Sequence, residues 1–299
     1  MNDDYKPNLN LELAKQMMEQ QLYEEALSIL EKGLKENPSN KDFLWLKAKI
    51  LFITGKFNET IETLSSLILL EKSNAKAYEL MGETYRCLNN LEVAEEYYQK
   101  ALELDSKSFV SWLGKGKIAY HKGEFQTAIL CFKTFVQENV ERSDIWHLLA
   151  KAYKSVNNAL EAIDSYNMAI DFDPLNKELY EELGDIYFEL GHKDIAKEKY
   201  LQALQVEEKT RDINISLYLK VIKILLEENQ NLRAFNLCNE ILVFQKNNVD
   251  ALFLSGVALI QMGNIPEGKK RVEEAYSIEK RDDIWDYLNS LEKEIYFNR

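Results

Sequence analysis

The chain has 299 residues, 46% of them hydrophobic and 29% charged, a balance typical of folded chains with a large core or an extended array, and one that argues against disorder. Only 11 glycines and 4 prolines are present, so there is little turn chemistry for β-strands and the composition predicts an all-α fold. The 37 lysines and arginines against 50 aspartates and glutamates give a net charge of −13, which opposes nucleic-acid binding because phosphate contacts need clustered cations.

The first segment, 1–6, is predicted to be an amino-terminal tail. The opening sequence MNDDYKPNLN is acidic and polar, whereas a secretory signal is basic and then apolar, and no stretch is long enough to span a bilayer. Cys87, Cys131 and Cys238 lie far apart without CxxC spacing, so neither a disulfide framework nor a zinc knuckle is expected. These features predict a cytoplasmic protein without membrane insertion.

Residues 7–210 repeat with a period of 34 residues. A large residue recurs at this step in the first half of the units, at Leu44, Tyr78, Trp112, Trp146 and Tyr180. A small residue recurs at the same step in the second half, at Ala26, Thr60, Ala94, Ala128, Ala162 and Ala196. Six contiguous repeats are therefore predicted, with no residue inserted or deleted between them.

The repeat at 143–176 shows what each repeat encodes. Its first apolar stripe has the i, i+3, i+4, i+7 spacing of a helix and consists of Trp146, Leu149, Ala150 and Tyr153. Asn157 and Asn158, which have little helix preference, separate it from a second stripe formed by Ala162, Tyr166 and Ala169. Each repeat thus predicts two antiparallel helices that bury their stripes against each other.

The period changes after residue 210. Ala196 and Ala234 are four residues further apart than the repeat allows, which predicts an insertion at 211–214, followed by two further repeats over 215–282. Ile222 occupies a slot that holds glycine or alanine in the other repeats, so it is expected to push the paired helix outward and to change the path of the array locally. The last segment, 283–299, is predicted to be a capping helix that covers the apolar end of the array.

These residues resemble the tetratricopeptide repeat, whose 34-residue pattern reads W-x2-L-G-x2-Y, then A-x3-F, then P. In the fifth repeat the pattern is matched by Trp146, Leu149, Ala150, Tyr153, Ala162, Tyr166, Ala169 and Pro174, with alanine for the usual glycine. The resemblance covers roughly nine-tenths of the chain, counting 34 residues for each repeat. It implies a right-handed α-solenoid superhelix of eight antiparallel helix-pair repeats plus a carboxy-terminal capping helix, with the first helices lining a concave groove.

The middle of this groove is predicted to be cationic. Its candidate peptide-binding residues lie one position beyond the core stripe and are Lys117, Tyr120, His121, His147, Lys151 and Lys154. Such a patch could hold an acidic or phosphorylated peptide, with Tyr120 as a hydrogen-bond donor. The alternative is a solvated lysine face that balances the acidic groove positions of the sixth repeat.

Two apolar flanks are also predicted in the groove, Trp45 with Phe52 and Phe253 with Ile260. Large apolar side chains on a groove face could be anchor pockets for a partner. The alternative is contact with a neighbouring helix, such as the amino-terminal segment or the carboxy-terminal cap. The lysine, asparagine and arginine clamp by which some family members bind chaperone tails is not seen in three adjacent repeats.

No constellation of catalytic residues is found in the sequence. The histidines, His121, His147 and His192, have no Cys, His or carboxylate at metal-ligand spacing, and there is no phosphate loop or nucleophile elbow. The sequence predicts a non-enzymatic adaptor without cofactor or metal, which binds a peptide or helix segment of a partner protein in its groove. The alternative is a structural scaffold that self-associates or supports a larger complex, and an RNA-binding repeat is the less favoured third reading.

Overall fold

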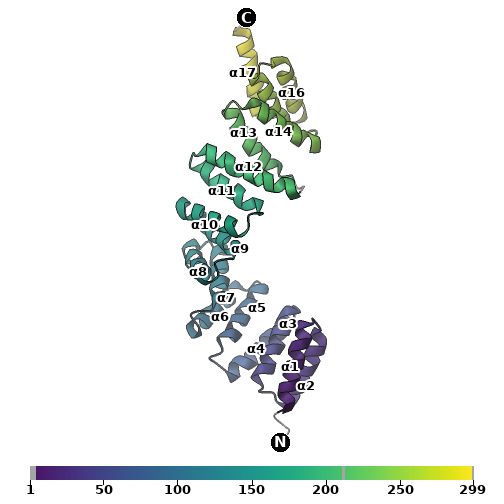
Figure 1. The fold of residues 1–299 in the computed structure, drawn as a ribbon, viewed down its shortest axis with the longest axis vertical. Helices are drawn as coiled ribbons and strands as arrows, with labels where there is room; N and C mark the ends of the chain where they lie inside the picture. The colour runs from purple at the N-terminus through teal and green to yellow at the C-terminus, as the bar shows by residue number, and fades with distance from the viewer. Residues whose placement is uncertain (1–4, 211–212, 298–299) are drawn as a thin grey trace. The chain divides into compact units, whose positions relative to one another are not determined.

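The computed structural model describes residues 5–210 and 213–297, and over these ranges the regular structure is entirely helical (Figure 1). The helices fall into two compact units, Met1–Asn158 and Ala159–Arg299. The first unit contains α1 (Tyr5–Glu19), α2 (Tyr23–Glu36), α3 (Lys41–Ile53), α4 (Phe57–Leu70), α5 (Ala75–Cys87), α6 (Leu91–Leu104), α7 (Phe109–His121), α8 (Phe125–Glu138) and α9 (Ser143–Ser155). The second unit contains α10 (Ala159–Phe172), α11 (Lys177–Glu189), α12 (Lys193–Thr210), α13 (Ile215–Glu227), α14 (Asn231–Phe244), α15 (Val249–Gln261), α16 (Ile265–Ile278) and α17 (Asp282–Phe297). The predicted all-α class is confirmed.

Consecutive helices within each unit form antiparallel hairpins that stack on one another. Side chains just ahead of several first helices cap them: Asn40 Oδ1 accepts from the Phe43 N–H at 3.1 Å, and Asn248 Oδ1 accepts from the Ala251 N–H at 2.9 Å. These bonds satisfy backbone donors that a helix leaves unpaired in its first turn, so the cap fixes where each first helix begins.

In the first unit, Tyr98 of α6 links two successive hairpins. Its hydroxyl donates to Glu83 Oε1 of α5 at 2.5 Å, and its ring lies against Gly82 of the same hairpin. The ring also lies against Gly114 of α7, where an added Cβ would be 2.3 Å from the ring carbon Cζ. Tyr98 is fully buried, so the two glycines provide the space that this aromatic ring fills.

In the second unit, the tyrosines at the position of Tyr98 make different contacts. Tyr200 of α12 donates to Asp185 Oδ1 of α11 at 2.7 Å, and the ammonium of Lys220 from the next hairpin lies 5.4 Å from the centre of its ring. Tyr166 of α10 donates to Glu182 Oε2 of α11 at 2.8 Å. The same tyrosine position therefore meets a different partner in each following hairpin.

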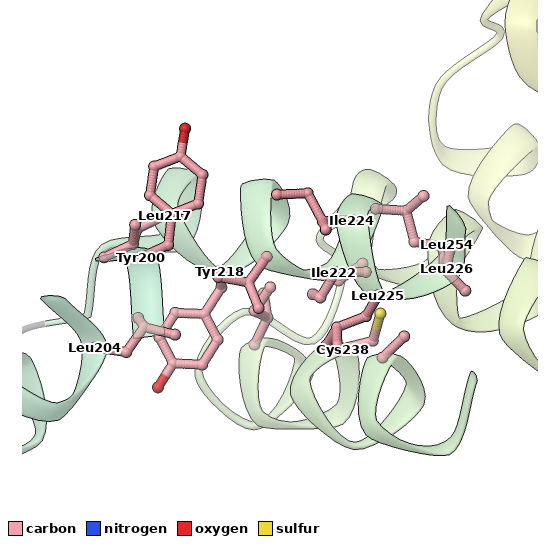
Figure 2. Close-up of a cluster of buried hydrophobic side chains, with 14 of the residues drawn as sticks. Tyr200, Leu204, Leu217, Tyr218, Ile222, Ile224, Leu225, Leu226, Cys238 and Leu254 are labelled. Carbon is pink, nitrogen blue, oxygen red and sulfur yellow. The ribbon is translucent and has the colours of Figure 1, made fainter. Parts of the chain in front are cut away.

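The largest buried cluster of the second unit joins α12, α13, α14 and α15 (Figure 2). Figure 2 shows Ile222 and Cys238 within this cluster, and both side chains are fully buried. The helix α12 has 18 residues, whereas α10 and α14 have 14 each. The longer spacing between Ala196 and Ala234 is thus accommodated by about one additional helical turn. Positions 211 and 212 of the predicted insertion lie outside the described residues.

The helix α17 covers the end of the last hairpin. Its Ile284 and Leu288 are buried against Leu252 of α15 and against Val272 and Ala275 of α16. Residues 298 and 299 of the predicted capping segment lie outside the described residues.

Candidate functional site

A pocket opens between the first helices of the first two hairpins, α1 and α3. It has a volume of about 420 Å³ and is lined by Leu11, Lys15, Met18, Glu19, Asp42, Trp45, Leu46 and Lys49. Trp45 supplies the largest apolar wall, and the charged groups of Lys15, Glu19, Asp42 and Lys49 complete the lining. A pocket with apolar walls and a few polar groups has the character of a ligand or peptide site.

Sequence reasoning missed the contribution of α1 to this pocket. Leu11, Lys15 and Met18 lie 34 residues before Trp45, Lys49 and Phe52, so they hold the same register one repeat earlier. The 34-residue period of the sequence could have identified these three residues of α1 as members of the pocket. Phe52 itself packs on Phe57 of α4, with ring centroids 5.9 Å apart.

Two polar groups of this pocket have no partner among the residues that the structure describes. Trp112 and Trp146 each donate their indole N–H to a main-chain oxygen, of Ser106 at 3.0 Å and of Val140 at 2.7 Å. By contrast, over residues 5–210 and 213–297 neither the Trp45 indole nor the Lys49 ammonium has a hydrogen-bond or ion-pair partner. An indole N–H and a cation beside an apolar wall can both be offered to a bound segment.

The predicted cationic residues lie on two helices of the first unit, Lys117, Tyr120 and His121 on α7 and His147, Lys151 and Lys154 on α9. Asp144 at the start of α9 is paired with Arg142 at 2.7 Å. The hydrogen bond from Arg142 lowers the pKa of the Asp144 carboxyl, and the charge of Lys117 contributes in the same direction. The Tyr120 ring lies edge-on to Phe125 at 5.5 Å and near His121 at 6.4 Å.

The acidic groove positions on α5 have internal partners. Glu79 accepts from Ser108 Oγ at 2.5 Å, and Glu83 is paired with Arg86 at 2.7 Å. Burial raises the pKa of the Glu79 carboxyl above its ordinary value, although the hydrogen bond from Ser108 acts in the opposite direction. Glu79 is thus bound to the start of the next hairpin, whereas Glu83 is bound by Arg86 and Tyr98 within its own hairpin.

The acidic positions on α11 are bridged by the next hairpin. Lys220 of α13 pairs with Glu181 at 2.9 Å and with Asp185 at 2.7 Å, and Asn214 donates to Glu181 at 2.9 Å. Burial alone would lower the pKa of Lys220, but the hydrogen bonds to Asp185 and Glu181 and the charges of both carboxylates raise it above its ordinary value. The acidity of this face is thus partly neutralised within the protein.

The second predicted apolar flank lies in contact with neighbouring helices. The Phe253 ring stands edge-on to Tyr287 of α17, with centroids 5.5 Å apart. Ile260 lies against Gly268 of α16, where an added Cβ would be 2.6 Å from Ile260 Cγ1. Both side chains are half-buried in contacts with neighbouring helices, Phe253 with the capping helix α17 and Ile260 with α16, which is the kind of contact that the alternative to an anchor pocket describes.

Metal-ion and membrane features were sought over the described ranges. There, no group of three or more His, Cys, Asp or Glu side chains is arranged to hold a metal ion. In the same part of the chain, every helix is too short or too polar to cross a bilayer. All three cysteines are free thiols, with Cys131 and Cys238 buried and Cys87 exposed.

Comparison with solved structures places the fold among known helical repeat proteins. The C-terminal part of a TPR repeat-containing protein from Cytophaga hutchinsonii superposes with a TM-score of 0.60 at 14% identity, over 93% of this chain and 99% of that one. The structure of Naa15/Naa10 bound to HypK-THB gives a TM-score of 0.56 at 17% identity, over 93% of this chain and 43% of that one. At such identities the likeness concerns the fold alone.

Sequence comparison finds relatives of the same kind. Human tetratricopeptide repeat protein 13 is 30% identical over 129 residues, which is 43% of this chain and 15% of that protein. The BBSome complex member BBS4 of Bos taurus is 22% identical over 274 residues, which is 82% of this chain and 53% of that protein. The chain therefore spans at most about half the length of these two relatives.

Family models described as tetratricopeptide repeat match residues 17–83, 75–108, 143–174 and 177–210, together just over half of the chain. The matches fall on the segments whose 34-residue period and helical hairpins are described above. The chain belongs to the tetratricopeptide repeat family.

Proposed function

We propose that this protein is a non-enzymatic adaptor that binds a peptide or helix segment of a partner protein on the face formed by its first helices. The family fold supports a role in protein–protein interaction or as a scaffold. The bovine relative is named as a member of the BBSome complex, which is in keeping with a role inside an assembly. The three free cysteines favour a reducing compartment such as the cytoplasm.

The observation that carries this proposal is the pocket between α1 and α3. Its apolar wall can take a large side chain of a partner, while the unpartnered Trp45 indole can donate to a main-chain carbonyl of the bound segment. The unpartnered Lys49 ammonium can pair with a carboxylate of that segment. A bound segment would thus satisfy two groups that have no partner within the described part of the chain.

The cationic residues of α7 and α9 extend the proposal to an acidic or phosphorylated segment. Lys117 and Lys151 lie 34 residues apart, at the same position as Lys49 in the pocket. An extended chain that followed this position along the first helices would meet Lys49 of α3, then Glu83 of α5, which is paired with Arg86, and then Lys117 of α7 and Lys151 of α9. The Tyr120 hydroxyl would add a hydrogen-bond donor beside Lys117.

The experiment is affinity purification with quantitative mass spectrometry, followed by calorimetric titration of a synthetic peptide from the segment of the partner that binds. Lys49→Glu and Lys151→Glu are expected to weaken the interaction at least about tenfold each, because they place a negative charge against an acidic segment. Trp45→Ala is expected to weaken it by removing the apolar wall. Circular dichroism checks that each variant keeps its helices.

The matched control is Lys133→Glu, the same charge reversal at an exposed position on the second helix α8. Its binding should equal that of the unmodified protein. A partner retained equally by all four variants would contradict binding on this face.

A further inference from the structure

The charged groups that line the pocket between α1 and α3 are not paired with one another. Elsewhere on α3 a cation has its own carboxylate, since Lys47 pairs with Glu31 at 3.4 Å. Within the part of the chain that the structure describes, however, the Asp42 and Glu19 side chains of the lining have no ion-pair or hydrogen-bond partner, as is also the case for Lys49. The pocket therefore offers an ammonium group and two carboxylates to a ligand.

These three charges and the Trp45 ring lie at different levels along the helices. On α3, Asp42, Trp45 and Lys49 have the i, i+3, i+7 spacing of one stripe, so Trp45 lies about 4.5 Å and Lys49 about 10.5 Å beyond Asp42 along the axis. Glu19 of α1 holds the repeat position of Ile53, which is about 6 Å beyond Lys49. Because α1 and α3 are both first helices and run in the same direction, the pocket presents an anion, an aromatic ring, a cation and an anion along its length.

A helix is the conformation whose side chains match these levels. Starting from Glu19, the levels lie at about 0, 6, 12 and 16.5 Å, and helix residues n, n+4, n+8 and n+11 have the same rises on one stripe. In an extended chain, side chains on one face are about 6.7 Å apart, so the fourth would lie about 3.5 Å beyond Asp42. A helix that runs antiparallel to α1 and α3 also brings its last carbonyl groups, which have no intrahelical partner, near the Trp45 indole N–H.

We propose that the pocket binds an amphipathic helix of the partner, antiparallel to α1 and α3, whose inward stripe carries a basic, an acidic, a large apolar and a basic residue at n, n+4, n+8 and n+11. This inference rests on the proposed adaptor function and specifies the segment that its pocket takes. The acidic residue pairs with Lys49, and the two basic residues pair with Glu19 and Asp42. The large apolar residue packs on Trp45 and Leu11.

The charge order selects against a segment that is acidic throughout. Such a segment would place carboxylates against Glu19 and Asp42, and like charges in contact oppose binding. Lys15 stands at the level of Lys49 and pairs with Glu12 at 2.7 Å, so the positive level is confined to the middle of the pocket. A partner that also engages α7 and α9 therefore carries this helix and its acidic stretch as separate parts of its chain.

The test uses three synthetic peptides, titrated by calorimetry into the purified full chain. The first is an alanine-based helical peptide with arginine, glutamate, phenylalanine and arginine at the stated spacing. The second exchanges the sign of each charge, and the third is the first peptide with two prolines in its middle, which break the helix. The first peptide should bind at least about tenfold tighter than either of the others.

Exchanging the charges of the pocket, in the variant Glu19→Lys with Asp42→Lys and Lys49→Glu, should reverse the preference, so that the second peptide binds about tenfold tighter than the first. Lys49→Glu alone should weaken binding of the first peptide about tenfold. The matched control is Glu96→Lys, at an exposed position on the second helix α6, which makes the same net change of two charges as the exchanged variant. It should keep the preference of the unmodified protein, and circular dichroism checks that every variant keeps its helices.

Each contrary result overturns a stated part of this inference. Equal binding of the first and third peptides would overturn the helical form of the segment. An unchanged preference in the exchanged variant, or a first peptide that does not bind the unmodified protein, would overturn the charge order. The adaptor function is judged separately, by whether Trp45→Ala and Lys151→Glu weaken binding of the natural partner, so it can stand when this inference fails.

Discussion

Gly256 of α15 and Gly268 of α16 face each other at the closest approach of their two helices. A Cβ on Gly256 would lie 2.8 Å from the Gly268 carbonyl oxygen, and a Cβ on Gly268 would lie 2.7 Å from the Gly256 carbonyl oxygen. Both neighbours are backbone atoms, which cannot turn aside as a side chain can. The pair of glycines therefore sets the distance between these two helices.

Gly268→Ala is expected to destabilise the protein, although alanine is the better helix former. The added methyl group forces α15 and α16 apart, and overpacking of this kind costs about 1–3 kcal/mol. The measurement is the free energy of unfolding from urea denaturation followed by circular dichroism. The control is Glu267→Ala at the adjacent exposed position, which should change stability by less than about 0.5 kcal/mol. A more stable Gly268→Ala variant would show that helix preference outweighs this contact.

Phe135→Ala is expected to cost about 3–5 kcal/mol, as is typical of large core truncations. Phe135 of α8 is 4% exposed and stands edge-on to Phe109, while Ala119 beside it is too small to fill the space. Urea denaturation measures the loss, and a change within the error of that measurement would contradict the role of Phe135 in filling the core beside Ala119.

Lys220→Met is expected to destabilise the second unit by about 1–3 kcal/mol, because it leaves Glu181 and Asp185 without their shared cation. The three side chains are 19–32% exposed, so solvent screening keeps the loss below that of a fully buried pair. Denaturant unfolding measures the effect. Lys223→Met, an exposed position one turn later on α13, is the control and should have little effect. Equal stability of the two variants would mean that the ion pairs of Lys220 contribute nothing to the free energy of unfolding.

Glu79→Gln is expected to change how stability depends on pH. The folded-state pKa of Glu79 is raised, so the folded protein binds this proton more tightly than the unfolded chain does. The resulting stabilisation is fully present below the unfolded value of 4.5 and is lost as the pH rises through the folded value. Glutamine is neutral at every pH and keeps an acceptor for Ser108, so the variant should be the more stable protein at about pH 7.

The advantage of Glu79→Gln should vanish as the pH falls below about 4.5, where Glu79 itself is protonated. Thermal unfolding across this pH range measures it. Glu92→Gln, at an exposed position on α6, is the control and should parallel the unmodified protein. A constant difference between Glu79→Gln and the unmodified protein over the whole range would contradict a raised pKa.

The helical repeat could be predicted because it depends on local periodicity. The spacing of Trp146, Leu149 and Tyr153 specifies an amphipathic helix in isolation, and the same period places Leu11 and Lys15 opposite Trp45 and Lys49. The all-α class and the family were accordingly predicted correctly. The groove residues on α7, α9 and α15 remain predictions.

The choice of partner between hairpins could not be predicted in the same way. Lys220 reaches back to Glu181 and Asp185, 39 and 35 residues earlier, and no local pattern distinguishes this lysine from Lys223 on the same helix. Such pairings depend on three-dimensional neighbours, which a period of 34 does not specify.

The tyrosine contacts make the order of the hairpins specific even though their lengths are nearly equal. Tyr98 needs the empty space above Gly114, while Tyr166 needs the carboxylate of Glu182. Exchanging the following hairpins would bring the Glu182 side chain into the space that the Tyr98 ring fills, and would leave the Tyr166 hydroxyl without its acceptor. The hairpins at these two junctions are therefore not interchangeable, and a rearranged array would need matched changes on both sides of each of these junctions.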